Sequence, residues 1–242
     1  MKELLAEIAP TGHLRAAINL SNALLVTGRS ASGEPEGVSP DIARAVARAL
    51  GVDVELVTFE GPGELADAAT EDRWDIGNIA AEPERARTIV FSPPYCEIQA
   101  TYLLPAGSPI ANVADVDSDG TRIAVKSRAA YQLWLAEHLR RATLVEAPSH
   151  EATFERFVDE GLDAQAGLRP KLLELAADLP GARVLDEPFT AVRQAIGCRP
   201  DRPRAARFLA EFVCGAIADG TVAALIERHG VAGRLSVARM SD

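Results

Sequence analysis

The sequence lacks several features that would assign it to a familiar class of protein. No apolar run approaches the ~18 residues that a membrane-spanning helix needs. There is no glycine-rich phosphate loop, no Cys/His spacing typical of a zinc site and no Ser/His/Asp signature. The only three cysteines are Cys96, Cys198 and Cys214, and we interpret them as small buried apolar residues. We therefore expect neither a metal nor a cofactor.

The charge balance excludes some partners and leaves the compartment open. The formal net charge is −10, which argues against nucleic acid or an anionic membrane as partner but not against a small anion in a locally basic cleft. The first residues include Glu3 and Glu7 and hold no uninterrupted apolar segment, so they do not form a secretory signal. Two interpretations remain: a cytoplasmic protein, or an exported one whose sequence begins after its signal.

What the sequence does contain is an alternation of strand and helix patterns. Hydrophobic residues make up 48% of the 242 residues, enough for one domain or two small ones with sizeable cores. A strand is predicted at Leu14–Ile18, then a helix capped by Ser39 and ended by Gly51. A strand at Val52–Phe59 and a helix at Glu64–Thr70 follow. This order predicts a parallel sheet built from right-handed crossovers.

A second α/β region follows the breaker cluster Pro105–Pro109. Its pattern again alternates short apolar runs with amphipathic segments. The predicted strands are Arg122–Val125, Thr143–Glu146, Ala164–Leu168 and Val192–Gly197. The predicted helices are Ala129–Arg140, one capped by Ser149, Pro170–Ala177, Arg204–Gly220 and Val222–His229.

The most informative segment is Trp74–Tyr95, WDIGNIAAEPERARTIVFSPPY. It predicts a buried strand, a polar turn carrying an arginine, and a return strand. Further segments stand around it in a set order: GVSPDIARAVARALGVDVELVTF from Gly37, DVDSDGTRIAV from Asp115, GLDA from Gly161, and IADGTVAALIERHG from Ile217. Together they resemble the solute-binding proteins of bacterial ABC transporters, family 3, the polar amino-acid type.

The resemblance implies an α/β protein with the two-lobed periplasmic binding protein type 2 fold. Each lobe would be a mixed sheet flanked by helices, and two strands would form a hinge. Lobe 1 would comprise residues 1–97 and 192–242, and lobe 2 residues 98–191, with the ligand in the cleft between them. The implied partners are a small organic acid or amino-acid-like solute and an ABC permease, and a monomer is expected.

In the predicted first lobe, Arg85 stands where the family's arginine grips a ligand carboxylate. A guanidinium offers a rigid fork of donors that matches a carboxylate. The alternative is a surface arginine paired with Glu82 or Glu84. Asn78 stands where relatives use a Ser or Gly that contacts the same carboxylate. Ala80 replaces a frequent Ser or Thr, which leaves only a backbone amide there.

A polar loop after the first strand is the second candidate. Asn19, Ser21 and Asn22 stand at the family's first cleft loop, where amino-acid binders usually carry an aromatic residue at the position of Asn22. Either these side chains contact the ligand or they form an Asx-turn that ends the strand.

In the predicted second lobe, Ser127, Arg128 and Ala129 stand where relatives form an anion-binding nest at a helix N-terminus. Arg128 replaces a glycine and Ala129 a threonine. The Arg128 side chain points either into the cleft or to solvent. Tyr131, one turn into the helix, either lines the cleft or packs in the core.

Leu168 and Arg169 depart from the family pattern. Amino-acid binders carry an aspartate at the position of Leu168, and it takes the ligand's ammonium group. A leucine cannot neutralise an ammonium, and a buried unpaired cation is costly. We therefore predict an organic acid that lacks a free α-amino group. If an amino acid binds instead, Glu146 or Asp186 is the expected partner of its ammonium.

Two alternatives to a transport-linked binding protein remain. The same fold resembles cyclohexadienyl dehydratase, an enzyme that would need a cleft acid of raised pKa. Glu146, Glu151 and His150 are the candidates, although a solvated helix start explains Glu151 as well. The other alternative is a cytoplasmic solute sensor. The expected function is binding without catalysis.

Overall fold

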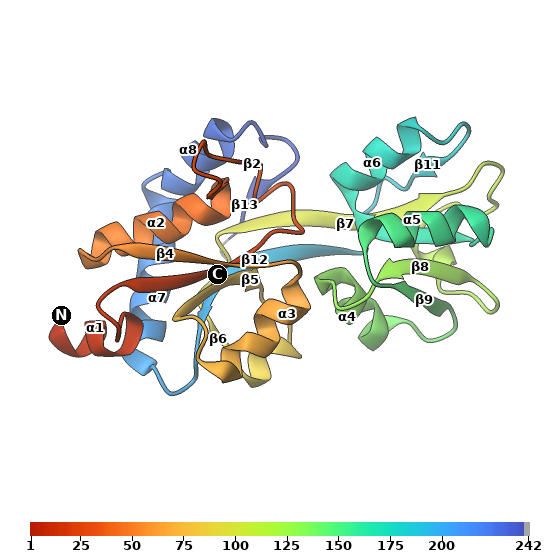
Figure 1. The fold of residues 1–242 in the computed structure, drawn as a ribbon. Helices are drawn as coiled ribbons and strands as arrows, with labels where there is room; N and C mark the ends of the chain where they lie inside the picture. Colours follow the sequence, from red (N-terminus) through yellow and green to blue (C-terminus); the bar gives the residue numbers. More distant parts are fainter. Residues whose placement is uncertain (240–242) are drawn as a thin grey trace. The chain divides into compact units, whose positions relative to one another are not determined.

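The computed structural model describes residues 1–239, which form two compact units. Unit 1 comprises Met1–Glu97 and the chain from Arg193 onward, and unit 2 comprises Ile98–Val192. Strands β7 (Cys96–Leu104) and β12 (Thr190–Cys198) carry the chain from one unit to the other. Each unit is an α/β body built on a mixed sheet (Figure 1).

The sheet of unit 1 has the strand order β4–β1–β5–β12. β1 (Leu14–Asn19) is parallel to both β4 (Val54–Phe59) and β5 (Ile76–Ala80), whereas β12 is antiparallel to β5. The carboxyl ends of β1, β4 and β5 therefore meet at one edge of the sheet. The remaining strands have two residues each: β2 (Gly28–Arg29), β3 (Pro35–Glu36), β6 (Val90–Phe91) and β13 (Ser236–Val237).

The helices of unit 1 come from both ends of the chain, and α1 packs against α7 and α2 against α8 (Figure 1). Their bounds are α1 Lys2–Ile8, α2 Val38–Leu50, α3 Pro62–Asp67, α7 Pro203–Ala218 and α8 Thr221–Arg228, with 3₁₀ turns η1 Ala68–Glu71 and η2 Arg85–Arg87. The predicted helices were close to these, but α1 was not predicted.

The start of α2 corrects one expectation. Gly37, not Ser39, is the N-cap residue. Ser39 lies buried in the first turn, and its amide donates to the Leu25 carbonyl at 3.1 Å. Gly37 has φ 149°, and a Cβ there would lie 2.2 Å from the Leu25 oxygen, so this close approach requires glycine. The predicted end at Gly51 is confirmed by its left-handed conformation, φ 70°.

The core of unit 1 decides which way β5 points its side chains. Trp74, Leu65 and Ile79 pack in one apolar cluster, and Trp74 Nε1 donates to the Leu65 carbonyl at 3.1 Å. A Cβ on Gly77 would lie 3.2 Å from both Trp74 and Leu65 side chains. Gly77 and Ile79 therefore face α3. Since side chains alternate along a strand, Asn78 points to the opposite face of the sheet.

The sheet of unit 2 has the order β7–β10–β8–β9. β10 is antiparallel to β7 and parallel to β8, which is parallel to β9, so the carboxyl ends of β8, β9 and β10 share one edge. The bounds are β8 Arg122–Lys126, β9 Thr143–Ala147, β10 Ala164–Leu168, β11 Arg183–Val184, η3 Val113–Val116, α4 Ala130–His138, α5 His150–Asp159 and α6 Arg169–Ala177. Ser149 caps α5 as predicted, accepting from the Ala152 amide at 3.1 Å.

Within residues 1–239, no single helix has both the length and the apolarity of a membrane span. α7 and α8 have both only when taken together, and they are bent by 69° at the break between them.

Candidate functional site

Arg85 lies at the carboxyl edge of the unit 1 sheet, in the turn that follows β5. It begins η2, its side chain is buried with 4% of the residue exposed, and its Nη1 donates to the Ala80 carbonyl at 3.0 Å. Its own carbonyl accepts from the Ile89 amide at 3.0 Å, which closes the turn. Arg85 is therefore not a solvent-exposed turn residue, and its guanidinium is held against the end of the strand that carries Asn78.

Asn78 is a deeply buried polar residue of unit 1. It lies in the middle of β5, between Ile18 of β1 and Ile196 of β12, and only 1% of it is exposed. Neither its Nδ2 nor its Oδ1 has a hydrogen-bond partner among the described residues. A buried amide without partners costs free energy, and native proteins rarely leave one unsatisfied. Its donor and acceptor suit a bound polar group.

The loop after β1 forms two Asx-turns. The Ser21 amide and hydroxyl both donate to Asn19 Oδ1, at 3.1 and 2.9 Å, and the Leu24 amide donates to Asn22 Oδ1 at 3.1 Å. The Asx-turn interpretation therefore describes the local structure of this loop. Asn19 ends β1 at the edge where β5 ends at Ala80, and a contact of this loop with a solute stays a prediction.

In unit 2, the loop between β8 and α4 is held by two side chains that sequence reasoning did not connect to it. The Ser127 hydroxyl donates to Glu146 Oε2 at 2.5 Å. The Arg128 amide donates to Gln132 Oε1 at 3.0 Å, and Gln132 Nε2 donates to Glu146 Oε1 at 3.2 Å. Ala129 is the N-cap of α4 without a side-chain cap. A glutamine in the first turn of a predicted helix was the available signal for this arrangement.

Tyr131 and Arg169 occupy different surroundings. Tyr131 is buried, with 4% exposed, and burial raises the pKa of its hydroxyl. Leu168, half-buried, ends β10 and is the N-cap of α6. Arg169 donates to the carbonyls of Leu185 and Asp186 at 2.6 and 3.0 Å and pairs with the Asp186 carboxylate at 3.2 Å. Arg169 thus holds the segment after β11, and the structure does not join it to Ser127 and Arg128.

Two of the acid–base candidates of unit 2, His150 and Glu151, have pKa values shifted against a general-acid role. Burial, reinforced by the positive charge of Lys126, lowers the pKa of His150 to about 4. Hydrogen bonds from its own backbone amide and from Ser149 lower the pKa of Glu151. A general acid at neutral pH needs a raised carboxyl pKa or an imidazole that still carries its proton. Neither residue meets that need.

The cysteines and possible metal ligands take no part in these clusters. Cys96 and Cys198 are buried, Cys214 is half-buried, and all three are free thiols. Within residues 1–239, no group of three or more His, Cys, Asp or Glu side chains is arranged to hold a metal ion.

Solved structures of solute-binding proteins match this fold along nearly the whole chain. A receptor for L-cysteine from Neisseria gonorrhoeae superposes with a TM-score of 0.76 at 20% identity, covering 97% of this chain and 99% of that one. The ancestral amino acid-binding protein AncCDT-1, a precursor of cyclohexadienyl dehydratase, gives 0.74 at 23%, covering 93% and 97%. The amino acid ABC transporter substrate-binding protein AbpA from Streptococcus pneumoniae, bound to L-arginine, gives 0.72 at 19%, covering 92% and 96%.

These likenesses show the fold of the chain. The fold is that of the two-lobed type 2 periplasmic binding proteins, which confirms the predicted fold class. The model of the bacterial extracellular solute-binding proteins, family 3, matches residues 16–232. The chain therefore belongs to that family, which confirms the resemblance drawn from the motifs. A comparison with curated proteins finds no match.

Proposed function

We propose that this protein binds a small carboxylate-bearing solute and serves as the substrate-binding component of an ABC-type uptake system. The observation that carries the proposal is Asn78, whose buried amide has no partner among the described residues. Asn78 lies two residues before Ala80 on β5, so the two side chains share one face of the strand, and the Arg85 guanidinium donates to the Ala80 carbonyl. An amide and a guanidinium together offer the donors that a carboxylate accepts.

The residues at the carboxyl edge of the unit 2 sheet support a more specific proposal. We infer that the solute is an organic acid without a free α-amino group. Leu168, at the end of β10, supplies no charge. Asp186 is paired with Arg169 and so does not stand ready for an ammonium. A desolvated ammonium facing Leu168 would lose its water without gaining a partner.

The solute itself can be identified directly. Mass spectrometry of the protein as purified, after denaturation, reports any small molecule that leaves with it. Calorimetry with succinate and glutarate, each against the matching amino acid, then ranks the solutes. Binding of at least one carboxylate is the expected result. No binding across this panel together with a neutral occupant in the purified protein would overturn the proposal.

Asn78→Leu separates a binding role from a structural one. Leucine fills a similar volume and removes an unsatisfied buried amide, so the free protein should keep or gain stability. Affinity for the bound acid should nevertheless fall, because the amide's hydrogen bonds are lost. The control is Thr153→Val, which removes a buried hydroxyl on α5 of unit 2 that already has a partner, the Ser149 carbonyl. Equal losses of affinity in both variants would contradict a specific role for Asn78.

The dehydratase-like alternative makes a different demand. It requires turnover of a prephenate-like cyclic acid, which ultraviolet spectroscopy follows directly. The lowered pKa values of His150 and Glu151 do not favour it. Measurable turnover that survives in Arg85→Ala but disappears in Glu146→Gln would favour the enzyme over the binding protein.

A further inference from the structure

The loop Lys126–Ala129 of unit 2 contains a residue in a conformation that only glycine adopts freely. Arg128 has φ 60°, in the left-handed region, where a Cβ crowds the backbone. The only other described residue besides glycine with a positive φ is Asp72, in unit 1. Something must therefore stabilise the loop around Arg128 against relaxation to an ordinary backbone conformation.

Gln132 supplies part of that stabilisation. It is the third residue of α4, 7% exposed, and its Oε1 accepts from the Arg128 amide at 3.0 Å. A Gln or Glu at this position can reach back to the amides that precede its helix, as in one half of a capping box. Ala129, the N-cap, has no side chain that could share this task. Gln132 is thus the side chain that holds the amide of the strained residue.

Glu146 holds both Gln132 and the other end of the loop. Its Oε1 accepts from Gln132 Nε2 at 3.2 Å, which sets the orientation of the Gln132 amide. Its Oε2 accepts from the Ser127 hydroxyl at 2.5 Å. Hydrogen bonds to an ionised acceptor are stronger than neutral ones. A single carboxylate on β9 therefore fastens two successive loop residues, one directly and one through Gln132.

We propose that Gln132 and Glu146 are positioning residues that hold the Lys126–Ala129 loop of unit 2 in one conformation for solute binding. The role in binding rests on the function proposed above. A loop that is ordered before the solute arrives loses less conformational entropy on binding. Both residues act through Ser127 and Arg128, and neither needs to touch the solute.

Amide hydrogen exchange on the full chain tests the ordering. The Ser127 and Ala129 amides bond to the carbonyls of Ala147 and Lys126, so their exchange reports opening of the loop without a direct bond to Gln132. Gln132→Met and Glu146→Gln should each accelerate this exchange about tenfold. Gln99→Met and Glu137→Gln, at exposed positions of the same unit, should leave it unchanged.

A combination of variants separates positioning from general packing. Gln132→Met is repeated in the backgrounds Arg128→Ala and Arg128→Gly, which both lack the guanidinium but differ in backbone strain. If Gln132 acts against the backbone strain at residue 128, Gln132→Met should accelerate amide exchange in the Arg128→Ala background. It should accelerate exchange much less in the Arg128→Gly background. Equal acceleration in both backgrounds, or no acceleration in the single variants, would overturn the inference.

Calorimetry with succinate and L-arginine as probes connects the loop to binding. Gln132→Met and Glu146→Gln should weaken whichever probe binds the unaltered protein about tenfold, and the loss caused by Gln132→Met should be smaller in the Arg128→Gly background than in the Arg128→Ala background. If Arg85→Lys weakens binding while Gln132→Met does not, the positioning role is wrong and the proposed function stands. If neither probe binds the unaltered protein, these solutes are wrong for the proposed function, and the exchange data still decide the ordering of the loop.

Discussion

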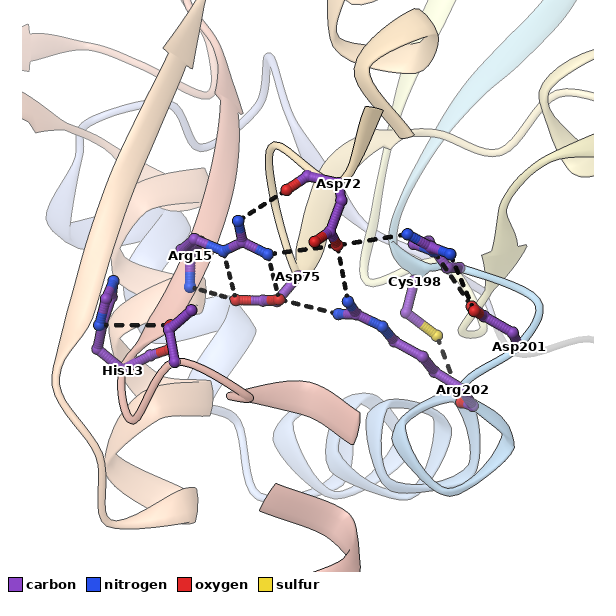
Figure 2. A network of polar contacts seen from close by, with 9 residues as sticks. His13, Arg15, Asp72, Asp75, Cys198, Asp201 and Arg202 are labelled. Carbon is purple, nitrogen blue, oxygen red and sulfur yellow. Dashed lines mark hydrogen bonds and ion pairs between the residues drawn. The ribbon is translucent and has the colours of Figure 1, made fainter. Parts of the chain in front are cut away.

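Arg15 of β1 forms an ion pair with the buried Asp75, the residue that directly precedes β5. Arg15 Nη2 lies 2.9 Å from Asp75 Oδ1 and Nε lies 3.1 Å from Oδ2, while the Arg15 amide donates to Oδ2 at 3.0 Å. Arg202, at the start of α7, donates to Asp75 Oδ1 at 2.9 Å from the other side (Figure 2). Asp75 is fully buried, so β1, β5 and the segment after β12 meet at one desolvated carboxylate.

Asp75→Asn should destabilise the protein by about 3 kcal/mol, because it leaves two arginines beside a neutral amide. Chemical denaturation measures the loss, and Asp119→Asn, at an exposed position, is the control. Burial by itself raises the pKa of Asp75, but hydrogen bonds from Arg15 and Arg202 outweigh it and the pKa is lowered. Its stabilising contribution is present above the unfolded value of about 3.9 and is lost as the pH falls through the folded value. The variant should lack this acid-dependent loss.

Arg85→Ala should weaken binding of a carboxylate solute by about 2–4 kcal/mol, the cost of truncating one partner of a desolvated charge pair. Because Arg85 is buried and donates to the Ala80 carbonyl, the free protein should also lose about 1–3 kcal/mol of stability. Arg85→Lys keeps the positive charge but loses the planar set of guanidinium donors. It should weaken binding with a smaller loss of stability. Unchanged affinity in both variants would remove Arg85 from the site.

Succinate should bind more tightly than aspartate, and glutarate more tightly than glutamate. The reason is that Leu168 stands where an amino-acid binder needs a carboxylate, while Asp186 is paired with Arg169. Calorimetry or a thermal-shift screen of these pairs decides the point. Micromolar binding of an amino acid, with no binding of its deaminated analogue, would show that the ammonium has a partner. Glu146→Gln would then be the first variant to test.

Arg128→Gly should leave the protein about 1 kcal/mol more stable than Arg128→Ala. Both variants remove the guanidinium, so the difference reports only the backbone. Alanine keeps a Cβ at φ 60°, whereas glycine accepts this conformation without strain. The comparison is made by chemical denaturation of the two variants side by side. Equal stability would mean that the loop relaxes out of the left-handed region once the side chain is gone.

His150 should make the protein less stable in mildly acidic solution. Its folded pKa is about 4 against an ordinary 6.5, first because it is buried and then because Lys126 is near. Between these two values the unfolded chain binds a proton that the folded protein does not, so stability falls as the pH drops from 6.5 towards 4. Since His150 is half-buried, about 1–2 kcal/mol is expected after screening. His150→Asn should flatten this slope in denaturation curves, and the exposed His138→Asn should not.

The parts of the fold that were predicted well are those whose evidence is local. The strand Ala164–Leu168 and the cap Ser149 agree with the structure, because apolar runs and capping residues act within a few positions. The two-residue strands β2, β3, β11 and β13 were not predicted, since two residues show no period. Ser39 was misplaced as a cap because the contact that decides the start of α2, between Gly37 and Leu25, joins residues twelve apart.

The candidate site divides in the same way. The segment WDIGNIAAEPER predicts the turn that carries Arg85, because the strand residues and the turn-forming proline are neighbours in the chain. That Arg85 is buried against Ala80 depends on the folded turn. The Asn78 amide lacks hydrogen-bond partners because its neighbours on the two adjacent strands are Ile18 and Ile196. A local sequence pattern does not show whether a buried side chain lacks hydrogen-bond partners.

The sequence by itself determined the family, the α/β class and the arginine turn, because periodicity, turn chemistry and motif order act through neighbouring residues. Only the tertiary structure decided which polar groups are satisfied. It turned Arg169 to the segment after β11, joined Glu146 to Ser127 and buried Asp75 between Arg15 and Arg202. These pairings link residues 16 to 127 positions apart. Their energies depend on desolvation and on distances of about 3 Å, which exist only once the strands are packed.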